Sequence, residues 1–350
     1  MGEPARKILD RGPAITRSIN LNFQGDWGQA NFHRIMSWLV QELCDRCGPR
    51  SRVAIFSMRG GGSEGVSLVN DGEMHIALGT PVALMGAAQT GEAIFNGQKF
   101  PQLRALAVLP QDDRMILGID PKYGCRTFAE IREKKPPIKL VIGPDSPDSP
   151  TGWVSHRFLE AHGITPNLIR SWGGEVVDTW CRPEQCLIPV KEASSDITAA
   201  VHEAIMTPWW TNIIDGPRKF IPVPAEPEAL EKLHKMTLLE PATLPAGYWD
   251  SLKEEIRTLS FRDFLLFCRE DLPDDIAYLL TWCLVETKSA IHLIQSKWQR
   301  PPFHYTPLRR DTIANTDIFH ELSESQADKA EDAFLTSHIA FSDSMTHYNA

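Results

Sequence analysis

The stretch RVAIFSMRGGGSEGVSLVNDGEMHIALGTP, residues 52–81, carries the pattern that decides the fold. It begins with a strand pattern at Arg52–Ser57, and the glycine-rich turn Arg59–Glu64 follows before a helical stretch. A second strand pattern, Met74–Leu78, ends at Gly79–Pro81. A strand, a helix and a strand at this spacing predict a βαβ unit in an α/β fold with mostly parallel sheets.

The same alternation continues on both sides of this stretch. Ser18–Phe23 predicts a strand, and apolar residues recur at helical spacing between Phe32 and Leu43. The further strand predictions are Leu103–Val108, Met115–Ile119, Lys139–Ile142, Leu168–Trp172, Asp196–Val201 and Lys219–Val223, and the further helix predictions are Trp153–His162 and Asp274–Ser296.

The length predicts two lobes, because 350 residues and 39.3 kDa exceed what one compact core usually holds. We interpret the charged, proline-rich stretch Arg126–Pro137 as the passage into the second lobe and Pro241–Tyr248 as the return hinge. The predicted first lobe is discontinuous, at 16–118 and 258–330, the second lobe is 119–257, and a polar tail spans 331–350.

Composition argues against several partners and sites. A formal net charge of −9 and a pI near 5.7 argue against a nucleic-acid groove or an anionic membrane surface. No apolar run reaches the roughly eighteen residues of a membrane span, and Met1–Arg17 lacks the apolar core of a signal peptide. The seven cysteines are an odd, scattered set, so we expect reduced thiols in the cytoplasm. Cys44 and Cys47 resemble half a zinc site or a redox pair, but without a second pair we predict no metal.

Several marks in order carry a resemblance to a known family. The turn at 61–63 precedes Asn70–Ala77, which resembles the family's Gly-x-x-Asp-Ile-Ala strand start, and Ser149 and Thr151 stand where the family has a Gly-Ser-Gly-Thr turn. The later marks are Asp196–Ala200, Leu244–Tyr248 and Asp271–Tyr278. Over roughly residues 16–300 the chain resembles the TAXI-type solute-binding proteins associated with TRAP transporters, within the periplasmic-binding-protein fold class. The resemblance implies a two-lobed, type II clamshell whose cleft holds a small ligand.

The chain also departs from that family. Val66 stands where the family usually has an amide, Pro150 replaces a glycine of the second turn, and Ile318–Glu321 keeps little of the family's His-Pro-Gly-Ala ending. The export signal that a periplasmic receptor needs is also missing from the first residues. These departures argue against delivery of a solute to a membrane permease, and they leave ligand capture between the lobes as the implied role.

Two turns are predicted to bind an anion in that cleft. Gly61 and Gly62 let the backbone approach a ligand closely, Ser63 adds a hydroxyl donor, and Ser149 and Thr151 would do the same from the other lobe. The alternative is that the glycines form only a loop that leads into a helix. The predicted ligand-binding residues are Trp27, Arg59, Gly61, Gly62, Ser63, Glu64, Thr80, Ser149, Thr151, Trp172, Trp209 and Trp210.

Four of the ten tryptophans, Trp27, Trp172, Trp209 and Trp210, fall at predicted strand ends or in adjoining loops. An aromatic lining favours a ligand with a flat body and an anionic end, so an aromatic carboxylate is the first expectation. The alternative is that Trp209 and Trp210 only seal the second lobe.

Ionisable residues on the same loops are candidates for proton transfer. His202 and Glu203 directly follow a predicted strand, and a histidine beside a carboxylate is common equipment for this chemistry. The candidate catalytic residues are His202, Glu203, His33 and Asp26, and each is alternatively a solvated or structural residue. We interpret Asp112 and Asp113 as an ordinary charged element boundary.

Two hypotheses about function follow. In the first, the protein is a cytoplasmic, cofactor-free decarboxylase or lyase, in which apolar tryptophans destabilise a carboxylate and a nearby acid protonates the carbanion. In the second, it is a non-catalytic binding protein for a small organic anion. The chain has no nucleophile elbow, HExxH, dinucleotide or Walker A motif, and no cofactor is predicted. The expected partner is a small organic carboxylate, with no nucleic acid and no membrane, and homo-oligomer formation is left open.

Overall fold

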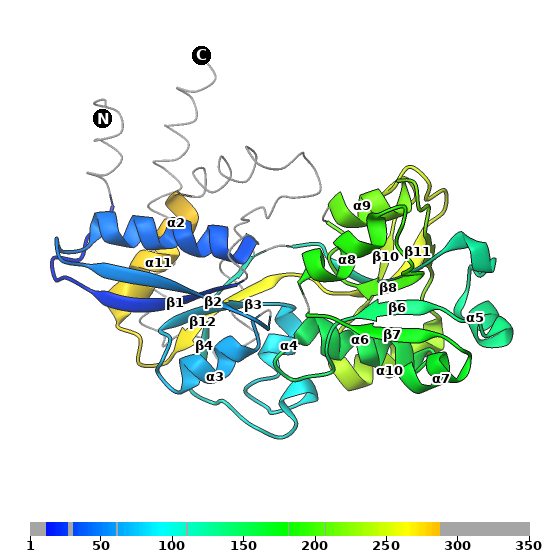
Figure 1. The fold of residues 1–350 in the computed structure, drawn as a ribbon. Helices are drawn as coiled ribbons and strands as arrows, with labels where there is room; N and C mark the ends of the chain where they lie inside the picture. Colours follow the sequence, from blue (N-terminus) through cyan, green and yellow to red (C-terminus); the bar gives the residue numbers. More distant parts are fainter. Residues whose placement is uncertain are drawn as a thin grey trace, which may run out of the picture.

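The protein has two α/β lobes that lie side by side (Figure 1). The structure is a computed structural model, and it describes residues 12–26, 31–60, 62–109, 111–180, 182–206 and 208–287. A five-stranded sheet, here sheet 1, forms the first lobe, and a seven-stranded sheet, here sheet 2, forms the second. The two-lobed α/β class predicted from the sequence is confirmed.

Sheet 1 has the strand order β2-β1-β3-β12-β4. In it β1 pairs in parallel with β2 and β3, whereas β12 runs antiparallel to β3 and β4. The strands are β1 (Asn20–Asp26), β2 (Arg52–Met58), β3 (Ile76–Gly79), β4 (Leu103–Leu109) and β12 (Phe264–Arg269). The βαβ unit predicted at 52–81 is therefore confirmed, with β1 inserted between its two strands.

Helices cover both faces of sheet 1 (Figure 1). On one face, Leu21 and Phe23 of β1 pack with Ile35 and Leu39 of α2 in a single apolar cluster. On the opposite face α3 contacts β3, β12 and β4. The helices of this lobe are α2 (Asn31–Arg46), α3 (Glu64–Asn70), α4 (Val82–Gly86), η1 (Ala93–Phe95) and α11 (Asp274–Glu286).

Sheet 2 has the order β10-β11-β5-β8-β6-β7, with β9 beside β5. In it β6 is parallel to β7 and β8, whereas β5 is antiparallel to β8, β9 and β11. The strands are β5 (Arg114–Ile119), β6 (Lys139–Ile142), β7 (Glu175–Asp178), β8 (Ala199–His202), β9 (Ile221–Val223), β10 (Pro241–Leu244) and β11 (Ile256–Ser260).

Among the described residues, no helix combines the length and the apolar character that a membrane crossing requires.

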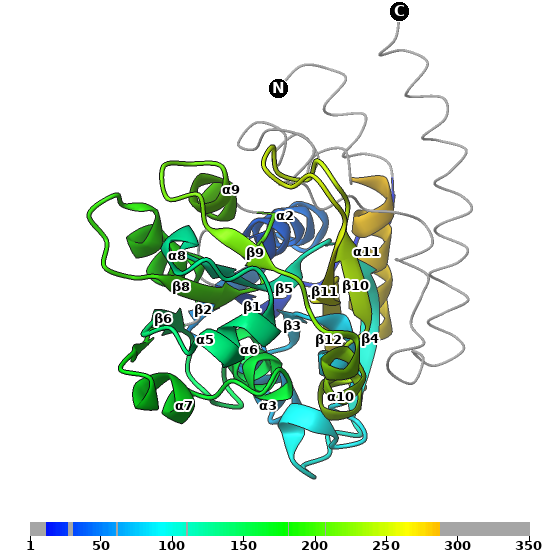
Figure 2. The ribbon, with the colours of Figure 1, turned by 90° about the vertical axis from the view of Figure 1, so that its right-hand side faces the viewer.

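Helices cover sheet 2 of the second lobe as well (Figure 2). The helices of this lobe are η2 (Pro121–Tyr123), α5 (Phe128–Lys134), α6 (Pro150–Ala161), α7 (Pro166–Ser171), α8 (Pro183–Lys191), α9 (Pro208–Ile214) and α10 (Pro227–Thr237).

The chain crosses between the lobes twice, from β4 to β5 and from β11 to β12. Both sheets are more mixed than predicted, because the strands that follow a crossing, β5 and β12, enter from the carboxyl ends of the parallel strands and run against them. The sheets change between Leu109 and Arg114 and again between Ser260 and Phe264. These positions replace the boundaries expected at 118 and 257.

Three other predictions differ from the structure. The predicted strand Leu168–Trp172 lies in α7, because the side chain of Thr165 caps that helix and Pro166 suits its first turn. The predicted passage Arg126–Pro137 contains α5, which a capping box starts at Thr127 within lobe 2. The predicted return hinge Pro241–Tyr248 contains β10 of sheet 2.

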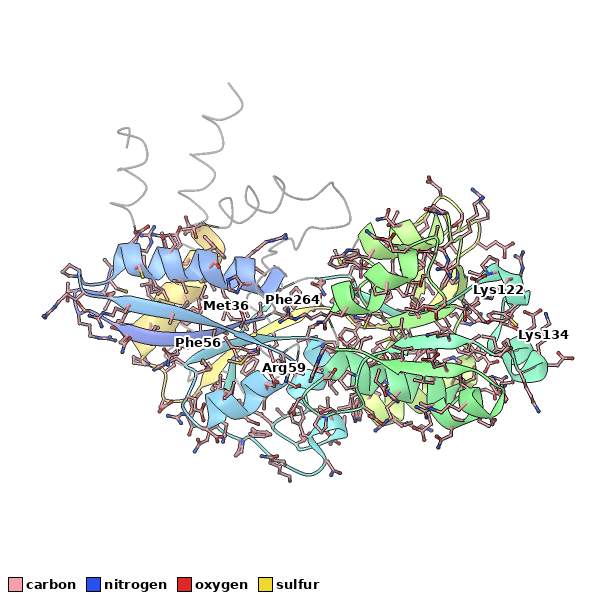
Figure 3. All side chains as sticks on the ribbon, viewed as in Figure 1. Met36, Phe56, Arg59, Lys122, Lys134 and Phe264 are labelled. Atoms are coloured by element: carbon pink, nitrogen blue, oxygen red, sulfur yellow. The ribbon has the colours of Figure 1, made fainter. Side chains whose placement is uncertain are left out.

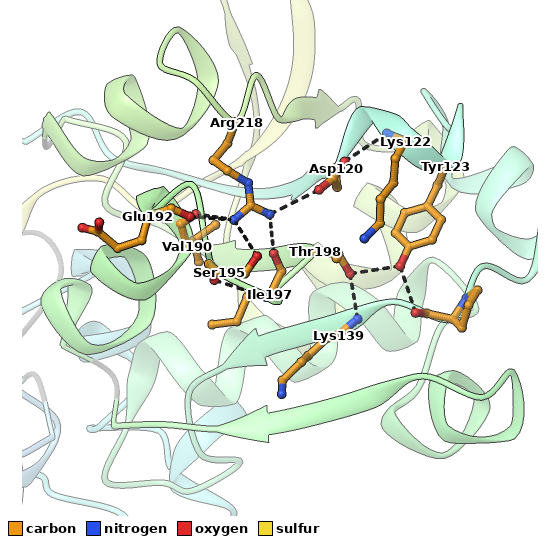
Figure 4. Close-up of polar contacts among 11 residues, drawn as sticks. Asp120, Lys122, Tyr123, Lys139, Val190, Glu192, Ser195, Ile197, Thr198 and Arg218 are labelled. Carbon is orange, nitrogen blue, oxygen red and sulfur yellow. Dashed lines mark hydrogen bonds and ion pairs between the residues drawn. The ribbon is translucent and has the colours of Figure 1, made fainter.

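Arg218 fastens the loop that leads into β8 (Figure 4). This loop lies at the end of lobe 2 where Figure 3 marks Lys122, remote from the Arg59 and Phe264 labels near the other lobe. The guanidinium of Arg218 also contacts the carboxylate of Asp120 at 3.2 Å. His202 lies at the other end of β8. The carbonyl groups that accept from Arg218 belong to Val190, Glu192, Ser195 and Ile197.

Candidate functional site

The lobes meet at the carboxyl ends of the parallel strands of both sheets, the edge at which open α/β sheets bind ligands. Here the turn between β2 and α3 touches the loop between β6 and α6. Ser63 Oγ donates to the carbonyl oxygen of Pro147 at 2.8 Å. Gly60 approaches Asp148 so closely that a Cβ at position 60 would overlap the carbonyl oxygen of Asp148. We call residues 59–63 and 147–151 the inter-lobe junction.

The two crossing segments, from β4 to β5 and from β11 to β12, lie next to this junction, and we call them the hinge. The backbone N–H of Asp263 donates to the carbonyl oxygen of Gln111 at 3.0 Å, and the N–H of Gln111 donates to Oδ1 of Asp263 at 2.9 Å. Thr80, a predicted ligand-binding residue, donates its hydroxyl to the carbonyl oxygen of Asp263 at 2.9 Å. Thr80 thus ties the end of β3 to the crossing segments.

Asp113 and Glu203 form a buried carboxyl pair next to the hinge. Asp113 accepts hydrogen bonds from Met206 N at 3.1 Å and from Gln111 Nε2 at 2.5 Å, and it also hydrogen-bonds to Glu203. Glu203 accepts from Thr151 Oγ1 at 3.3 Å. Burial raises the pKa of Asp113 to about 7 against the effect of these bonds. Since two carboxyl groups need one proton to hydrogen-bond, the pair retains that proton up to near-neutral pH.

His202, the first catalytic candidate, is 0% exposed at the end of β8. Its Nδ1 accepts a hydrogen bond from Ala204 N at 3.1 Å and lies 3.8 Å from Glu203 Oε1. Because side chains alternate along a strand, His202 faces the same side as Ala200, which packs with α8 and α9. Glu203 reaches Thr151 of α6 on the other side. The two members of the predicted His202–Glu203 pair are therefore close in space, but their side chains lie on opposite faces of sheet 2.

The turn after β2 contains most of the residues of lobe 1 that were predicted to bind a ligand. The Arg59 guanidinium lies 3.7 Å from the centre of the Trp180 ring. Gly62 has a φ of 114°, and a Cβ there would lie 2.6 Å from Gly79 Cα, so the turn requires glycine. Glu64 accepts from Gly60 N at 3.3 Å, and burial raises its pKa. Gly61 lies outside the described residues.

The start of α6 brings Ser149 and Thr151 to the same region, as predicted. Both hydroxyls form hydrogen bonds within the protein. Ser149 Oγ caps the helix by accepting from Gly152 N at 3.2 Å, and Thr151 Oγ1 donates to Glu203. Pro150 occupies the first helical position, where a missing N–H costs nothing.

The predicted tryptophan lining is not assembled at the junction. Trp210 is fully buried in the core of lobe 2, where its ring lies against Gly118, and Trp209 packs partly buried against the same cluster. Trp172 ends α7 at the start of β7, the end of sheet 2 opposite the junction. The alternative that Trp209 and Trp210 seal the second lobe fits this placement. Trp27 lies outside the described residues.

The remaining candidates lie elsewhere or outside the described part. His33 sits in the first turn of α2, with its Nδ1 beside Gly25 on the α2 face of sheet 1. The side chain of Asp26 is not among the described ones. Burial raises the pKa of Cys47 to about 11, which keeps its thiol protonated. Within the ranges that the structure describes, no group of His, Cys, Asp and Glu is arranged to hold a metal ion.

Three residues at or beside the junction escaped the sequence analysis. Asp113 looks like a charged boundary, Trp180 follows a strand that was not predicted, and Gln24 stands on β1 in an alternating pattern that resembles a solvated face. Gln24 is nevertheless 0% exposed. No signal in the sequence marks the burial of Asp113 and Gln24 or the contact of Trp180 with Arg59.

No protein-family model matches this chain, and no curated protein matches it. Solved structures do resemble it. A phosphonate-transporter binding protein from Pseudomonas aeruginosa is 8% identical with a TM-score of 0.48, and the match covers 94% of this chain and 99% of that chain. The periplasmic binding protein BugD is 11% identical with a TM-score of 0.47, covering 93% of this chain and 97% of that one.

A third structure, Rpa4515 from R. palustris with adipate, is 13% identical with a TM-score of 0.45, covering 92% of this chain and 98% of that chain. The chain itself has two α/β lobes joined by two crossings, as its strand order shows.

Proposed function

We propose that the protein is a non-catalytic binding protein that holds a small organic acid at the inter-lobe junction. One observation carries this proposal: a turn from each lobe reaches the other directly, with Ser63 Oγ 2.8 Å from the carbonyl oxygen of Pro147. A small molecule bound beside these turns would contact both lobes at once. The two crossings at the hinge would let the lobes close on it.

The start of α6 supports an acidic ligand. This helix has 12 residues, so its first turn carries the partial positive charge of a helix N-terminus. The backbone N–H of Thr151 donates to no described group. Arg59 adds a cation on the facing turn. An aromatic ring in the ligand loses its support, because Trp172 and Trp210 lie away from the junction.

The ionisable residues favour binding over turnover. A decarboxylase needs an acid that reaches the carbanion it protonates. His202 is fully buried with Nδ1 engaged by Ala204, and Glu203 is held by Thr151 and Asp113. These contacts describe residues that shape the junction and the hinge, which is the role that a binding protein requires of them.

Thermal shift with mono- and dicarboxylic acids, succinate and succinamate among them, tests the proposal. We expect at least one acid to raise Tm, and Thr151→Val to weaken its binding about tenfold because the variant removes the hydroxyl between α6 and Glu203. Thr243→Val, on exposed β10, is the matched control. A panel without any shift would overturn binding. Release of carbon dioxide from a bound acid would replace this proposal by the decarboxylase hypothesis.

Three finer predictions accompany this proposal. Membership of the TAXI-type family, a cytoplasmic location and the formation of homo-oligomers stay predictions from the sequence. Light scattering of the purified protein tests the last of them.

A further inference from the structure

The side-chain amide of Gln24 is buried, and no described residue hydrogen-bonds to it. Gln24 lies near the carboxyl end of β1 and is 0% exposed. Among the residues that the structure describes, neither its Oε1 nor its Nε2 has a hydrogen-bond partner. Burying an unpaired amide opposes folding, and native proteins rarely do so unless the group meets water or a ligand. A chain that needed only volume at this position would be served by an apolar residue of the same length.

The amide of Gln24 fits here only because position 65 carries no side chain. A Cβ at Gly65 would overlap Oε1 of Gln24. In the sheet register Gln24 pairs with Phe56 on one side and Ala77 on the other, so the three side chains share one face of sheet 1. Ala77 is buried, whereas Phe56 is 43% exposed. The amide is thus flanked by an exposed aromatic ring and a glycine.

This place adjoins the inter-lobe junction. Gly65 is two residues from Ser63, whose hydroxyl reaches Pro147 of the other lobe. Phe56 precedes Arg59 on the same strand and turn, and Figure 3 marks both residues. The unpaired amide therefore lies against the first turn of α3, directly after the turn 59–63 in the chain.

We infer that Gln24 is a ligand-contacting residue and that its amide recognises a primary carboxamide of the bound acid. This inference rests on the function proposed above and adds the chemical class of the ligand. An amide offers an acceptor oxygen and a donor NH₂, and both are unpaired here. A carboxylate can only accept, so it would leave Oε1 unpaired. A primary carboxamide supplies a donor and an acceptor side by side and satisfies both atoms.

Succinamate and succinate are the matched probes, because they differ only in one carboxamide. We expect the wild-type protein to bind succinamate at least tenfold more tightly than succinate by calorimetry. Gln24→Met keeps the length of the side chain and removes both polar atoms. It should abolish the preference for succinamate while leaving Tm without ligand unchanged or a few degrees higher. Gln41→Met, at an exposed position on α2, is the control and should keep the preference.

The outcomes separate this inference from the proposed function. If other acids bind and succinamate has no advantage, the binding function stands and the role of Gln24 is wrong. If no acid binds at all, both fail. A fall in Tm of many degrees for Gln24→Met also overturns the inference, because it would show that the amide serves the fold. Loss of the succinamate preference with Tm maintained supports it.

Discussion

The guanidinium carbon of Arg59 lies 3.7 Å from the centre of the Trp180 ring, and this contact joins the two lobes. Arg59 follows β2, one of the two edge strands of sheet 1, and Trp180 follows β7, one of the two edge strands of sheet 2. A cation above an aromatic face is attracted by the ring quadrupole. The contact therefore acts at the rim of the junction, where separation of the lobes would break it.

A double-mutant cycle with Arg59→Met and Trp180→Ala should reveal this coupling. Because Trp180 is 47% exposed, we expect only about 0.5–1 kcal/mol, or a two- to fivefold loss of ligand affinity for each single variant. The double variant should lose little more than either single variant. Calorimetry with an acid that binds measures the cycle, and additive losses would mean that the two residues act independently.

Gly60→Ala should hold the lobes apart. Its Cβ would overlap the carbonyl oxygen of Asp148, and that backbone atom cannot swing away as the end of a side chain could. We expect a larger radius of gyration by small-angle scattering and about tenfold weaker ligand binding. Ser57→Ala, exposed on β2, should change neither quantity. An unchanged radius of gyration for Gly60→Ala would contradict the closure geometry.

Asp113 predicts a pH dependence of stability. Burial raises its pKa to about 7, whereas an aspartate in the unfolded chain titrates near about 4. Between these pH values the unfolded chain has lost a proton that the folded protein keeps, so the free energy of unfolding falls as pH rises from about 4 to about 7. This stabilisation is complete below the lower value and is lost through the upper one.

Asp113→Asn should remove that dependence. The amide stays neutral and still donates to Glu203, so we expect the variant to exceed the wild type by about 2 kcal/mol at pH 8 and to lose this advantage at pH 5. Urea unfolding at both values measures the difference. Equal stability of both proteins at pH 8 would show that Asp113 is ionised there without cost. Arg114, Asp112 and Tyr248 also face this carboxyl and are unchanged in the comparison.

His202→Ala should lower the free energy of unfolding. The variant removes a fully buried side chain together with the hydrogen bond from Ala204 N to Nδ1, which together cost about 2–4 kcal/mol. The exposed His234→Ala is the control and should cost less than about 0.5 kcal/mol. Urea unfolding checks both. A stable His202→Ala protein with altered ligand chemistry would restore the catalytic prediction.

Local patterns predicted the elements that local interactions form. The strands and glycine turn of 52–81, and the strand Lys139–Ile142, follow from side-chain periodicity and turn chemistry among adjacent residues. The strand predicted at Leu168–Trp172 was wrong, because apolar residues alone do not separate a strand from a helix. Thr165 and Pro166 start a helix there. Strand β12 was missed, since its partners β3 and β4 lie far back along the chain.

The candidate site was predictable to the same extent. The turns at 59–64 and 149–151 were predicted from glycine and hydroxyl residues next to helix starts, and the structure brings them together. The tryptophans were not, because a position near a strand end does not say which end of the sheet that is. For Trp172 the strand itself was wrong: Leu168–Trp172 lies in and after α7, so Trp172 precedes β7 at the end away from the junction.

The sequence by itself determined two α/β lobes and the residue types of the two turns that meet between them. Only the tertiary structure decided which polar groups are buried and what they face. Asp113 meets Glu203, and Gln24 lies against Gly65 with its amide unpaired, through contacts between segments that are distant along the chain. Burial and pairing are properties of those contacts. A boundary aspartate and an alternating strand glutamine therefore carry no sign of them until the chain has folded.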